Sequence, residues 1–537
     1  MVAKYMGMEN TAKTLDPIEY SWQERALIAE ERALKAEAEL AKVLQKLQYV
    51  EAQLRLLTAK RFGRSSEKTN KNQLQLFEDA FNEAEATAEP LAPEPELVTV
   101  QTHKRTKSKG KKGINLEGLP ETVVEYRLPE EKLFCSCGHE RHIIGQEVTK
   151  ELVVVPAQFS VTKHVQYVYS CRHCEAHGDG SSPVVVKAPK PNRAFPGSIA
   201  SPSAVAHVIE EKYVMGVPLY RQEKQWERRG INLSRQNMAN WIMAAQHWLQ
   251  PIYDRMKEEL LKQYAIYADE TTVQVLKEDG RRAEAQSYMW LYRSGRYGPG
   301  IVLFEYQPNR SKEHPREFLK GFKGYLVTDA YAGYNDVKGV TRVGCWAHAR
   351  RGFDEAVKAA GKTVKNPKAL EGLKFCNDLF DIEHDLENAE PQERYEQRLQ
   401  RSKPVLEAFL VWLQKTKEEC VQKSHLGKAV DYCLNHWKEL SNFLLDGRLE
   451  LSNNRAERSI KSFVIGRKNF LFCITPRGAQ ASATIYSIVE SAKENGLKPF
   501  EYLKYLFTAL PNATSKDLDD FLPWSNTLPD HCRTTSR

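Results

Sequence analysis

The chain has 537 residues, and its 78 Lys and Arg side chains slightly outnumber its 70 Asp and Glu side chains, giving a net charge of +8. This length predicts two to four domains with a large core, and the charge favours a polyanionic partner only weakly. No apolar stretch approaches the ~20 residues that span a bilayer, and the N-terminus lacks the apolar core of a signal peptide. We therefore expect a cytoplasmic protein with no membrane partner, whose ten cysteines are thiols or metal ligands rather than disulfides.

The N-terminal part of the chain predicts one long helix, over about residues 20–68. Residues 21–60 contain no Gly or Pro, and apolar side chains recur in steps of three and four, the spacing of a coiled-coil seam. The seam consists of Ala33, Ala36, Leu40, Val43, Leu47, Val50, Leu54 and Leu57. Pairing through this leucine-zipper-like seam predicts a homodimer or a higher oligomer. The alternative is one amphipathic helix packed on its own chain.

Residues 69–118 are predicted to be a disordered linker with two blocks of opposite charge. Residues 78–97 are acidic and rich in Pro, a composition that does not bury enough apolar surface to fold. Residues 102–113 then carry a run of Lys and Arg. Such a run is either a solvated tail or a non-specific grip on phosphates.

Residues 119–190 contain two cysteine pairs separated by β-rich segments, which is the outline of a zinc ribbon. Zinc takes four tetrahedral thiolate or imidazole ligands, and such a closed site is structural. The predicted ligands of one Zn²⁺ ion are Cys135, Cys137, Cys171 and Cys174. The first pair is C-x-C rather than C-x-x-C, so His139 is an alternative to Cys135. Four buried free thiols are the other interpretation.

Residues 197–260 are predicted to be helical and to contact DNA. One helix ends near Gly230, and a second begins after Ser234, which is a suitable N-cap residue. Helix, short turn and capped helix is the outline of a helix-turn-helix, although many all-helical segments share it. On the second helix, Arg235, Gln236 and Asn240 are the candidate DNA-binding residues.

After residue 262 the pattern changes to strands, predicted over 264–276, 286–295, 300–308 and 324–334, with a short helix before the last. This order matches the start of a ribonuclease-H-like α/β domain. We assign that core to 262–360 and 447–490, so the fold class is multidomain α+β. In such a sheet the first and fourth strands are neighbours, so Asp269 in the first and Asp329 at the end of the fourth are expected to converge.

Two carboxylates about 4 Å apart repel by roughly 4 kcal/mol at an effective dielectric of 20. Either one takes up a proton or a divalent cation neutralises both. Hard oxygen ligands select Mg²⁺ or Mn²⁺. With Glu457 as a third ligand, Asp269 and Asp329 would hold two ions ~3.5–4 Å apart, the arrangement that cleaves phosphodiesters. The alternative is that Asp269 and Asp329 only stabilise turns.

Glu457 lies in "LSNNRAERSIK" (451–461), which predicts the start of a helix. One interpretation is a capping box, in which Asn454 caps the helix and Glu457 reaches back to it. The other is that Glu457 completes the metal site, beside basic side chains that hold the nucleic-acid backbone. On this interpretation the predicted DNA-binding residues of this segment are Asn454, Arg455, Arg458 and Lys461.

Five segments together closely resemble the DDE transposases of the insertion sequence 66 family: "YADETT", "VTDAYAGYN", "GCWAHARRGF", "GRLELSNNRAERSIKSFVIGRKNFLF" and "ENGLKPFEYL". The order of the predicted regions along nearly the whole chain is also similar. The resemblance implies that Asp269, Asp329 and Glu457 are the metal-binding triad. It further implies that residues 361–446 are a helical insertion in the core and that 491–537 are a short C-terminal segment. The C-x-C pair at Cys135 departs from the family's C-x-x-C.

The stretch "CWAH" resembles the C-x-x-H signature of several DDE transposases with such insertions. His348 is a candidate catalytic residue that hydrogen-bonds a scissile phosphate or a water at the metal site. The alternative is that Cys345 and His348 only support the site structurally.

These expectations converge on a nucleoid-associated transposase that binds the ends of a mobile element and catalyses cleavage and strand transfer with Mg²⁺ or Mn²⁺. Its partners are the element's terminal repeats, target DNA and, as the resemblance implies, accessory proteins from the same element. A hydrolytic nuclease with the same core is one alternative. A non-catalytic zinc-containing DNA-binding regulator is the other.

Overall fold

The computed structural model describes residues 158–170, 185–360, 367–421, 423–513 and 515–534, with scattered helical positions between 26 and 47. The chain divides into two compact units, residues 69–190 and the remainder. The linker prediction and the predicted zinc ligands lie outside the described residues. No helix in these described ranges has the length and apolarity needed to cross a bilayer.

The positions described near the N-terminus are helical, as the seam pattern predicts. Their large apolar side chains are exposed, among them Leu27, Leu34, Leu40, Val43, Leu44 and Leu47. The second half of the predicted seam, from Val50 to Leu57, lies outside the described residues. The coiled coil itself therefore stays a prediction.

In the unit of residues 69–190, the described residues form a short antiparallel ribbon. Strand β1 (Val168–Ser170) pairs with β2 (Val185–Lys187), with Tyr169 opposite Val186. The Gln166 side chain donates a hydrogen bond of 2.6 Å to the carbonyl of Ala188 and extends this pairing.

The larger unit is built on one five-stranded mixed sheet in the order β5-β4-β3-β6-β7. Its strands are β3 (Ala265–Gln274), β4 (Gln286–Ser294), β5 (Val302–Gln307), β6 (Tyr325–Thr328) and β7 (Thr341–Gly344). β3, β4 and β5 are antiparallel neighbours, whereas β6 and β7 run parallel to β3. The prediction that the first and fourth strands of this region are neighbours is confirmed by the pairing of β3 with β6.

The fourth strand is shorter than the predicted 324–334. It ends at Thr328 and is followed by a 3₁₀ helix over Ala332–Asp336. The reason is local: Asp329 Oδ1 accepts a hydrogen bond of 2.9 Å from the backbone N–H of Tyr331. This Asx-type turn replaces the ladder hydrogen bonds that a longer strand would need. The short helix predicted before the fourth strand is present as α7 (Glu313–Phe318), which precedes β6.

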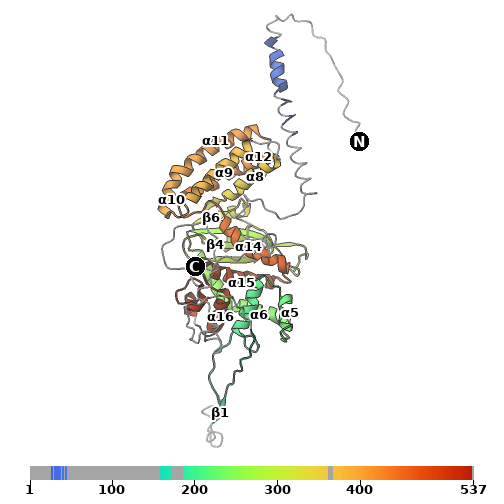
Figure 1. Cartoon of the computed structure of the whole chain (residues 1–537), viewed down its shortest axis with the longest axis vertical. Helices are drawn as coiled ribbons and strands as arrows, with labels where there is room; N and C mark the ends of the chain where they lie inside the picture. The colour runs from blue at the N-terminus through green and yellow to red at the C-terminus, as the bar shows by residue number, and fades with distance from the viewer. Residues whose placement is uncertain are drawn as a thin grey trace, which may run out of the picture. The chain divides into compact units, whose positions relative to one another are not determined.

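Below the sheet in Figure 1 lie the helices α4 (Pro202–Tyr213), α5 (Leu219–Glu227), α6 (Arg235–Leu260), α15 (Pro476–Glu494) and α16 (Pro499–Ala509), whereas α14 (Asn454–Phe470) is at the level of the strands and contacts β3 and β4. The most buried of them is α15, which lies against β5. Its Ser487 and Ser491 hydroxyls accept hydrogen bonds of 2.7 and 2.9 Å from the backbone N–H groups of Phe304 and Val302. These bonds satisfy the outer edge of the sheet, which otherwise would be open.

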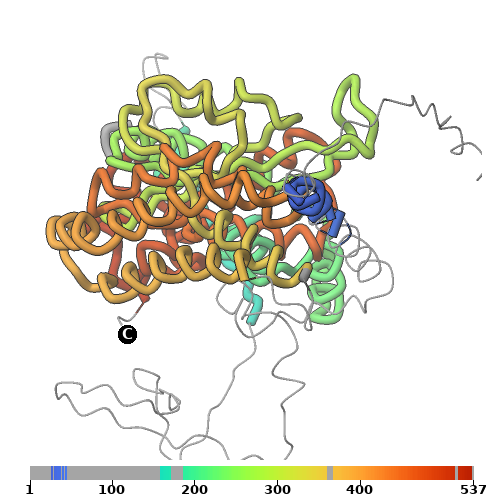
Figure 2. The backbone as a smooth tube through the Cα atoms, turned by 90° about the horizontal axis from the view of Figure 1, so that it is seen from above, coloured from blue at the N-terminus to red at the C-terminus, as the bar shows by residue number. Residues whose placement is uncertain are grey.

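A second group of helices follows β7 (Figures 1 and 2): α8 (Trp346–Ala360), α9 (Pro367–Asp385), α10 (Pro391–Gln397), α11 (Lys403–Glu419), α12 (His425–Asn435) and α13 (Trp437–Ser441). A π-helical turn over Arg398–Ser402 joins α10 to α11. Trp346, Phe353, Phe409 and Trp412 pack their rings together at the centre of this group. We call residues 367–445 the inserted helices, because they separate β7 and α8 from α14.

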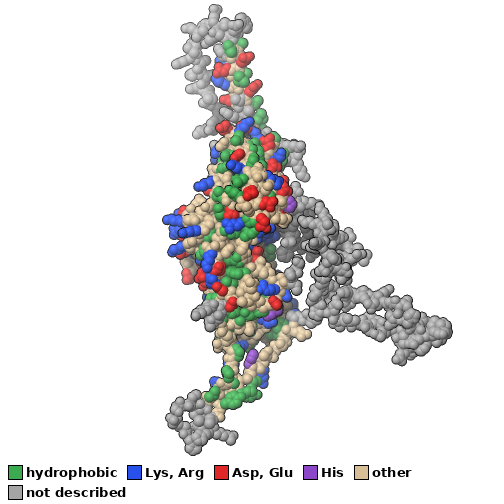
Figure 3. All heavy atoms as spheres, turned by 90° about the vertical axis from the view of Figure 1, so that its left-hand side faces the viewer, with side chains coloured by type: hydrophobic (Ala, Val, Ile, Leu, Met, Phe, Trp, Pro, Cys, Tyr) green, Lys and Arg blue, Asp and Glu red, His purple; other side chains and the backbone are tan. Residues whose placement is uncertain are grey.

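The described residues carry both signs of charge over one surface. On the face shown in Figure 3, Lys and Arg side chains are interspersed with Asp and Glu side chains over the compact part of the chain. This face therefore does not present a uniform basic surface to a polyanion.

Candidate active site

Two of the predicted carboxylates come from neighbouring strands: Asp269 lies within β3, and Asp329 directly follows the end of β6. The last register pair of β3 with β6 is Tyr267 with Val327. Asp269 and Asp329 each come two residues after that pair, on strands that run in the same direction. Because adjacent strands lie about 4.8 Å apart, this register brings both residues to the place where β6 ends. We call this place, at the carboxyl end of β6, the sheet edge.

The third predicted carboxylate, Glu457, lies in the first turn of α14, a helix that packs against β3. The Asn453 side chain donates a hydrogen bond of 2.9 Å to the carbonyl of Ala268, the residue before Asp269. Asn453 is 1% exposed, so this bond anchors the start of α14 to the strand. A carboxylate in the first turn of a helix is also favoured by the positive end of the helix dipole.

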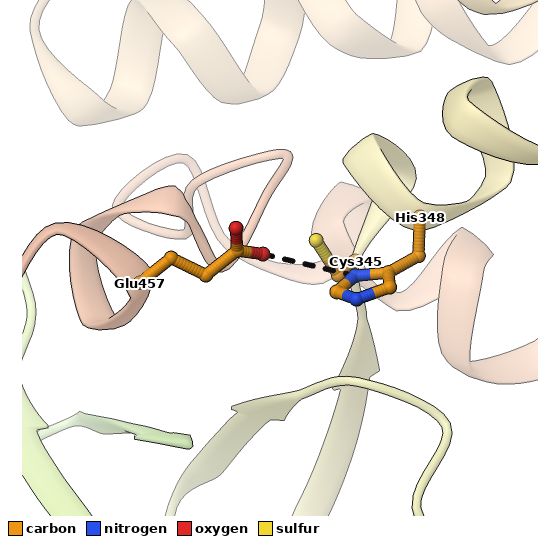
Figure 4. A group of neighbouring side chains, drawn as sticks. All are labelled: Cys345, His348 and Glu457. Carbon is orange, nitrogen blue, oxygen red and sulfur yellow. Dashed lines mark ion pairs between the residues drawn. The ribbon is translucent and has the colours of Figure 1, made fainter. Parts of the chain in front are cut away.

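The capping-box interpretation of Glu457 is wrong. Asn453, not Asn454, is the N-cap residue, and its side chain makes no capping hydrogen bond. Glu457 is then the fourth helical residue, and its backbone N–H donates to the Asn453 carbonyl at 3.1 Å. A capping box needs the carboxylate one position earlier. The Glu457 side chain instead points away from the cap, toward α8 (Figure 4).

The carboxylates act on one another electrostatically. Burial raises the pKa of Asp269 well above its ordinary value, and the negative charges of Glu270, Glu457 and Asp329 raise that pKa further. A hydrogen bond from the Glu270 backbone N–H, 2.9 Å from Asp269 Oδ1, opposes the shift. The fold thus brings Asp329 and Glu457 within electrostatic range of Asp269, whose surroundings disfavour its charged form.

Glu270 is an acidic residue of this region that the sequence prediction missed. Its side chain is 3% exposed and forms an ion pair with Arg310. The Tyr334 hydroxyl also donates to Glu270 Oε2 at 2.6 Å. Successive strand residues point to opposite faces, so Glu270 is expected to contribute charge to the site rather than a ligand beside Asp269. Its position next to Asp269 in "YADETT" was the available signal.

The C-x-x-H pair lies beside Glu457. Cys345 follows the last residue of β7, and His348 is in the first turn of α8. His348 Nδ1 lies 3.8 Å from Glu457 Oε1, and Arg351 lies 3.7 Å from Glu457 Oε2. Burial lowers the pKa of His348, whereas the charges of Glu457 and Asp329 raise it. The net lowering favours the neutral imidazole, the form that accepts a proton or binds a metal.

Cys345 is fully buried, and burial raises the pKa of its thiol to about 12. Hydrogen bonds from the backbone N–H groups of Asn453, His348 and Ala347 oppose that rise. The Asn453 N–H lies 3.1 Å from the sulfur. Cys345 therefore joins β7, α8 and the start of α14, the three elements that surround Glu457.

The basic residues predicted on α14 have different surroundings. Arg455 forms an ion pair of 2.9 Å with Glu450, so an acidic partner in the same chain already neutralises it. Arg458 is exposed, and Lys461 and Asn454 are half-buried. Farther along α14, Arg467 donates hydrogen bonds of 3.3 and 3.1 Å to the hydroxyls of Thr271 and Thr272 on β3. Sequence reasoning missed Arg467, which lies after the stretch 451–461 from which the DNA-binding residues of this helix were predicted.

The predicted helix-turn-helix residues lie at the start of α6. Ser234 caps this helix as predicted, accepting a hydrogen bond of 3.2 Å from the Asn237 N–H. Arg235, Gln236 and Asn240 are exposed, and Gln236 donates to Asn240 at 3.1 Å. Exposure leaves these side chains accessible to a partner, and their contact with DNA stays a prediction.

The three carboxylates offer the donor chemistry that a hard divalent cation needs, although in the described part of the chain the group of three with ligand atoms all within 4.8 Å of one another is Cys345, His348 and Glu457. The carboxylate side chains offer only oxygen ligands, which Mg²⁺ and Mn²⁺ prefer. The raised pKa of Asp269 reflects excess negative charge at a buried position, which a cation would neutralise. Glu457 Oε1 is buried and has no hydrogen-bond partner among the described residues, so this oxygen retains its capacity as a ligand.

Comparisons with known protein families agree on one assignment. Residues 197–481 match the model described as "Transposase IS66 family", and residues 487–524 match the "IS66 C-terminal element". Residues 133–175 match the "zinc-finger binding domain of transposase IS66". Residues 50–124 match "Transposase C of IS166 homeodomain". The zinc-finger match spans the four predicted cysteine ligands.

Relatives of similar length are known from Sinorhizobium fredii (strain NBRC 101917 / NGR234). The chain is 30% identical over 430 residues to the uncharacterized protein y4jD, covering 76% of this chain and 82% of the relative. It is 28% identical over 505 residues to the uncharacterized protein y4hP, covering 88% and 87% of the two chains. The family models and the sheet with its flanking helices are in agreement: the chain belongs to the IS66 family of transposases.

Proposed function

We propose that this transposase cuts DNA at the ends of its mobile element and joins the freed ends to target DNA, using Asp269, Asp329 and Glu457 as a metal-binding DDE triad. The observation that carries the proposal is the pairing of β3 with β6, which brings Asp269 and Asp329 to the same place, together with the Asn453 hydrogen bond to Ala268, which ties the start of α14 and so Glu457 to β3. Two strands and a helix far apart in the sequence supply the three carboxylates. A strand order in which β3 neighbours both β4 and β6 supports a ribonuclease-H-like core.

Two Mg²⁺ or Mn²⁺ ions, when bound, would stabilise the negative charge that develops on the attacking and leaving oxygens. Asp269 and Asp329 would hold the cations from the sheet edge, and Glu457 would complete the set from α14. In cleavage, a water oxygen attacks phosphorus, the bond from phosphorus to the 3′ oxygen breaks, and that oxygen takes a proton. In joining, the freed 3′-OH attacks a target phosphodiester and displaces its 3′ oxygen.

His348 is proposed to accept or donate a proton at this centre. Burial lowers its pKa, so the neutral ring is favoured at pH 7. His348 Nδ1 is buried and makes no hydrogen bond within the described residues. A neutral ring with a free nitrogen beside Glu457 is suited to contact a scissile phosphate or the attacking water.

The remaining regions are proposed to hold and organise the DNA. The exposed Arg235, Gln236 and Asn240 would contact the element ends, and Arg458 and Lys461 would contact the backbone beside the triad. A zinc ion held by Cys135 or His139 with Cys137, Cys171 and Cys174 would stabilise the ribbon that β1 and β2 begin. The N-terminal helix would pair copies of the chain. Accessory proteins of the same element would complete the assembly.

The test is strand cleavage and joining with Mg²⁺, on DNA that carries the inverted repeats flanking this gene. The expected result is that Asp269→Asn, Asp329→Asn and Glu457→Gln each lower cleavage at least about 10³-fold, roughly 4 kcal/mol of transition-state stabilisation. Asp385→Asn is the matched control, because Asp385 is an exposed carboxylate on α9. Full activity in the folded triad variants would refute the assignment.

The same assay distinguishes the two alternatives. A hydrolytic nuclease with the same triad would produce cleaved ends and no joined product. A non-catalytic regulator would bind the repeats without cleaving them, and the triad variants would bind as the wild type does.

A further inference from the structure

Three side chains of different chemistry meet where β7, α8 and α14 converge. The Cys345 Sγ, a His348 ring nitrogen and a Glu457 carboxylate oxygen all lie within 4.8 Å of one another. Figure 4 shows Glu457 pointing from α14 toward the His348 ring, with the Cys345 sulfur beside them. One residue of the group is fully buried and two are partly buried.

The facing atoms of His348 and Glu457 do not satisfy each other. His348 Nδ1 and Glu457 Oε1 are 3.8 Å apart, which is too long for a hydrogen bond. Both atoms are buried, and neither has a hydrogen-bond partner in the described part of the chain. Buried polar atoms without partners are costly, and such a pair calls for an explanation. Two ligands of one zinc ion lie at most about 4.3 Å apart, since Zn–N is about 2.0–2.1 Å and Zn–O about 2.0–2.2 Å.

The sulfur of Cys345 lies in surroundings suited to a metal thiolate. The backbone N–H of Asn453 donates a hydrogen bond to it, and the backbone N–H groups of His348 and Ala347 also lower the pKa of its thiol. The donor at Asn453 is 3.1 Å away and comes from the segment that leads into α14. Donors of this kind stabilise a negatively charged sulfur, and outer hydrogen bonds of this type orient metal ligands.

We propose that Cys345, His348 and Glu457 bind one zinc ion, with a water completing a tetrahedral set. Sulfur and nitrogen ligands favour zinc, whereas the oxygen-only set of Asp269 and Asp329 favours Mg²⁺ or Mn²⁺. On binding, the bond between sulfur and zinc forms and the thiol proton passes to solvent. Glu457 belongs to both sets and His348 has a role in both, so a chain with zinc bound here would not be in the catalytic state proposed above. The zinc site stands whether or not the chain cleaves DNA, because its ligands and its test involve no DNA.

The experiment measures zinc directly in the full-length chain. The background variant is Cys171→Ser with Cys174→Ser, which removes two predicted ligands of the zinc ribbon. After incubation with equimolar Zn²⁺ and dialysis, this background is expected to keep about one zinc per chain by atomic emission. Adding Cys345→Ser or His348→Gln is expected to lower the content to less than about 0.2. Replacing zinc by Co²⁺ should give a thiolate charge-transfer band that Cys345→Ser abolishes.

The matched control is Cys376→Ser in the same background, because Cys376 is an equally buried cysteine on α9 outside the group. It is expected to keep about one zinc per chain. His348→Gln retains polarity at a partly exposed position, so it gives the result even if Cys345→Ser does not fold. The proposal is overturned if the background variant holds no zinc. It is also overturned if folded Cys345→Ser and His348→Gln proteins hold as much zinc as the Cys376→Ser control.

Discussion

A charged side chain is fully paired in the inserted helices, whereas at the sheet edge a charged side chain lies near other charges of the same sign. Arg398 in the inserted helices is 0% exposed, yet every part of its guanidinium has a partner. It forms two hydrogen bonds of 2.7 Å with Glu383 and donates to the carbonyls of Phe443, Asp446 and Leu449. At the sheet edge, Asp269 is surrounded by the like charges of Glu270, Glu457 and Asp329.

The difference separates a structural charge from a functional one. A buried ion whose donors are all hydrogen-bonded needs no further ligand. The hydrogen bonds of Arg398 fix the packing of α9 against α10 and α11. A cluster of buried like charges is unfavourable in the isolated chain and becomes favourable only when a cation enters. Perturbed groups of this second kind concentrate at active sites. The contrast therefore supports the proposal that the chemistry takes place at the sheet edge, with the inserted helices in a supporting role.

The largest expected effect follows from breaking the paired charge. Arg398→Met leaves Glu383 buried without its partner, and we expect a loss of about 3–5 kcal/mol in the free energy of unfolding, measured by urea titration. Arg401→Met is the matched control, because the ion pair of Arg401 with Asp385 is at the surface. An exposed pair contributes at most about 1 kcal/mol. Equal losses in the two variants would contradict the structural role assigned to Arg398.

The sequence predicted which charged residues meet at the sheet edge, but not which charged residues pair in the inserted helices. Asp269 and Asp329 were identified because strand patterns are local and a parallel pair then fixes which residues are opposite. Nothing in the sequence distinguishes Arg398 from the other arginines of the inserted helices, because its pairing with Glu383 depends on how α9 and the π-helical turn pack. The sequence thus revealed where charge lies along strands, but not which charges are neutralised.

The same limit explains the errors at Glu457. Its place in the first turn of a helix was predicted, but the cap was assigned one residue late, because Asn453 is held by β3 rather than by the helix. The C-x-x-H stretch was noticed, yet its contact with Glu457 joins residues more than 100 positions apart. Only the packing of α8 beside the start of α14 brings them together. The ion pair of Glu270 with Arg310 was missed for a similar reason. Glu270 is on β3 and Arg310 is in the loop after β5, 40 residues away in the sequence.

A second test removes the unfavourable charge at the sheet edge. The pKa of Asp269 is raised in the folded state, so the folded chain binds its proton more tightly than the unfolded chain does. Stability is then highest at low pH and falls as pH rises from about 3.9, the unfolded value, through the folded pKa. The slope in this window is at most about 1.4 kcal/mol per pH unit for one group.

Asp269→Asn is expected to abolish that loss of stability in magnesium-free buffer. The variant should be more stable than the wild type at pH 7, and the difference should shrink toward pH 4, as followed by thermal unfolding across the pH range. Asp385→Asn, which changes an exposed carboxylate, controls for the loss of one charge. A wild-type chain as stable as Asp269→Asn at neutral pH would contradict the buried like-charge cluster.

A third test adds Mg²⁺, the cation that the carboxylates are proposed to bind. If Mg²⁺ binds the folded chain with a dissociation constant of about 1 mM, then 10 mM Mg²⁺ adds about 1.4 kcal/mol to the free energy of unfolding. Asp269→Asn and Glu457→Gln should lose most of this stabilisation, whereas Arg401→Met should keep it, as measured by thermal unfolding with and without Mg²⁺. Equal stabilisation of all four proteins would mean that the ion binds somewhere else.

The smallest expected effect concerns a basic residue beside the same edge. Burial lowers the pKa of Arg467, and no acidic group in the described ranges opposes that shift. Its guanidinium contacts only the hydroxyls of Thr271 and Thr272 among the hydrogen bonds described, so its charge remains available to a phosphate. Each phosphate neutralised in B-DNA contributes about −0.9 to the slope of log K against log salt concentration.

Arg467→Gln is therefore expected to make that slope shallower by about 0.9 and to weaken binding to all sequences alike, measured by fluorescence anisotropy across a salt series. Arg401→Gln should leave the slope unchanged, because Asp385 already neutralises Arg401. If Arg467→Gln binds with the wild-type slope, this arginine only supports β3 through its threonine contacts. If both variants change the slope equally, pairing within the chain does not decide which arginines reach DNA, and the distinction between paired and unpaired charge fails for basic residues.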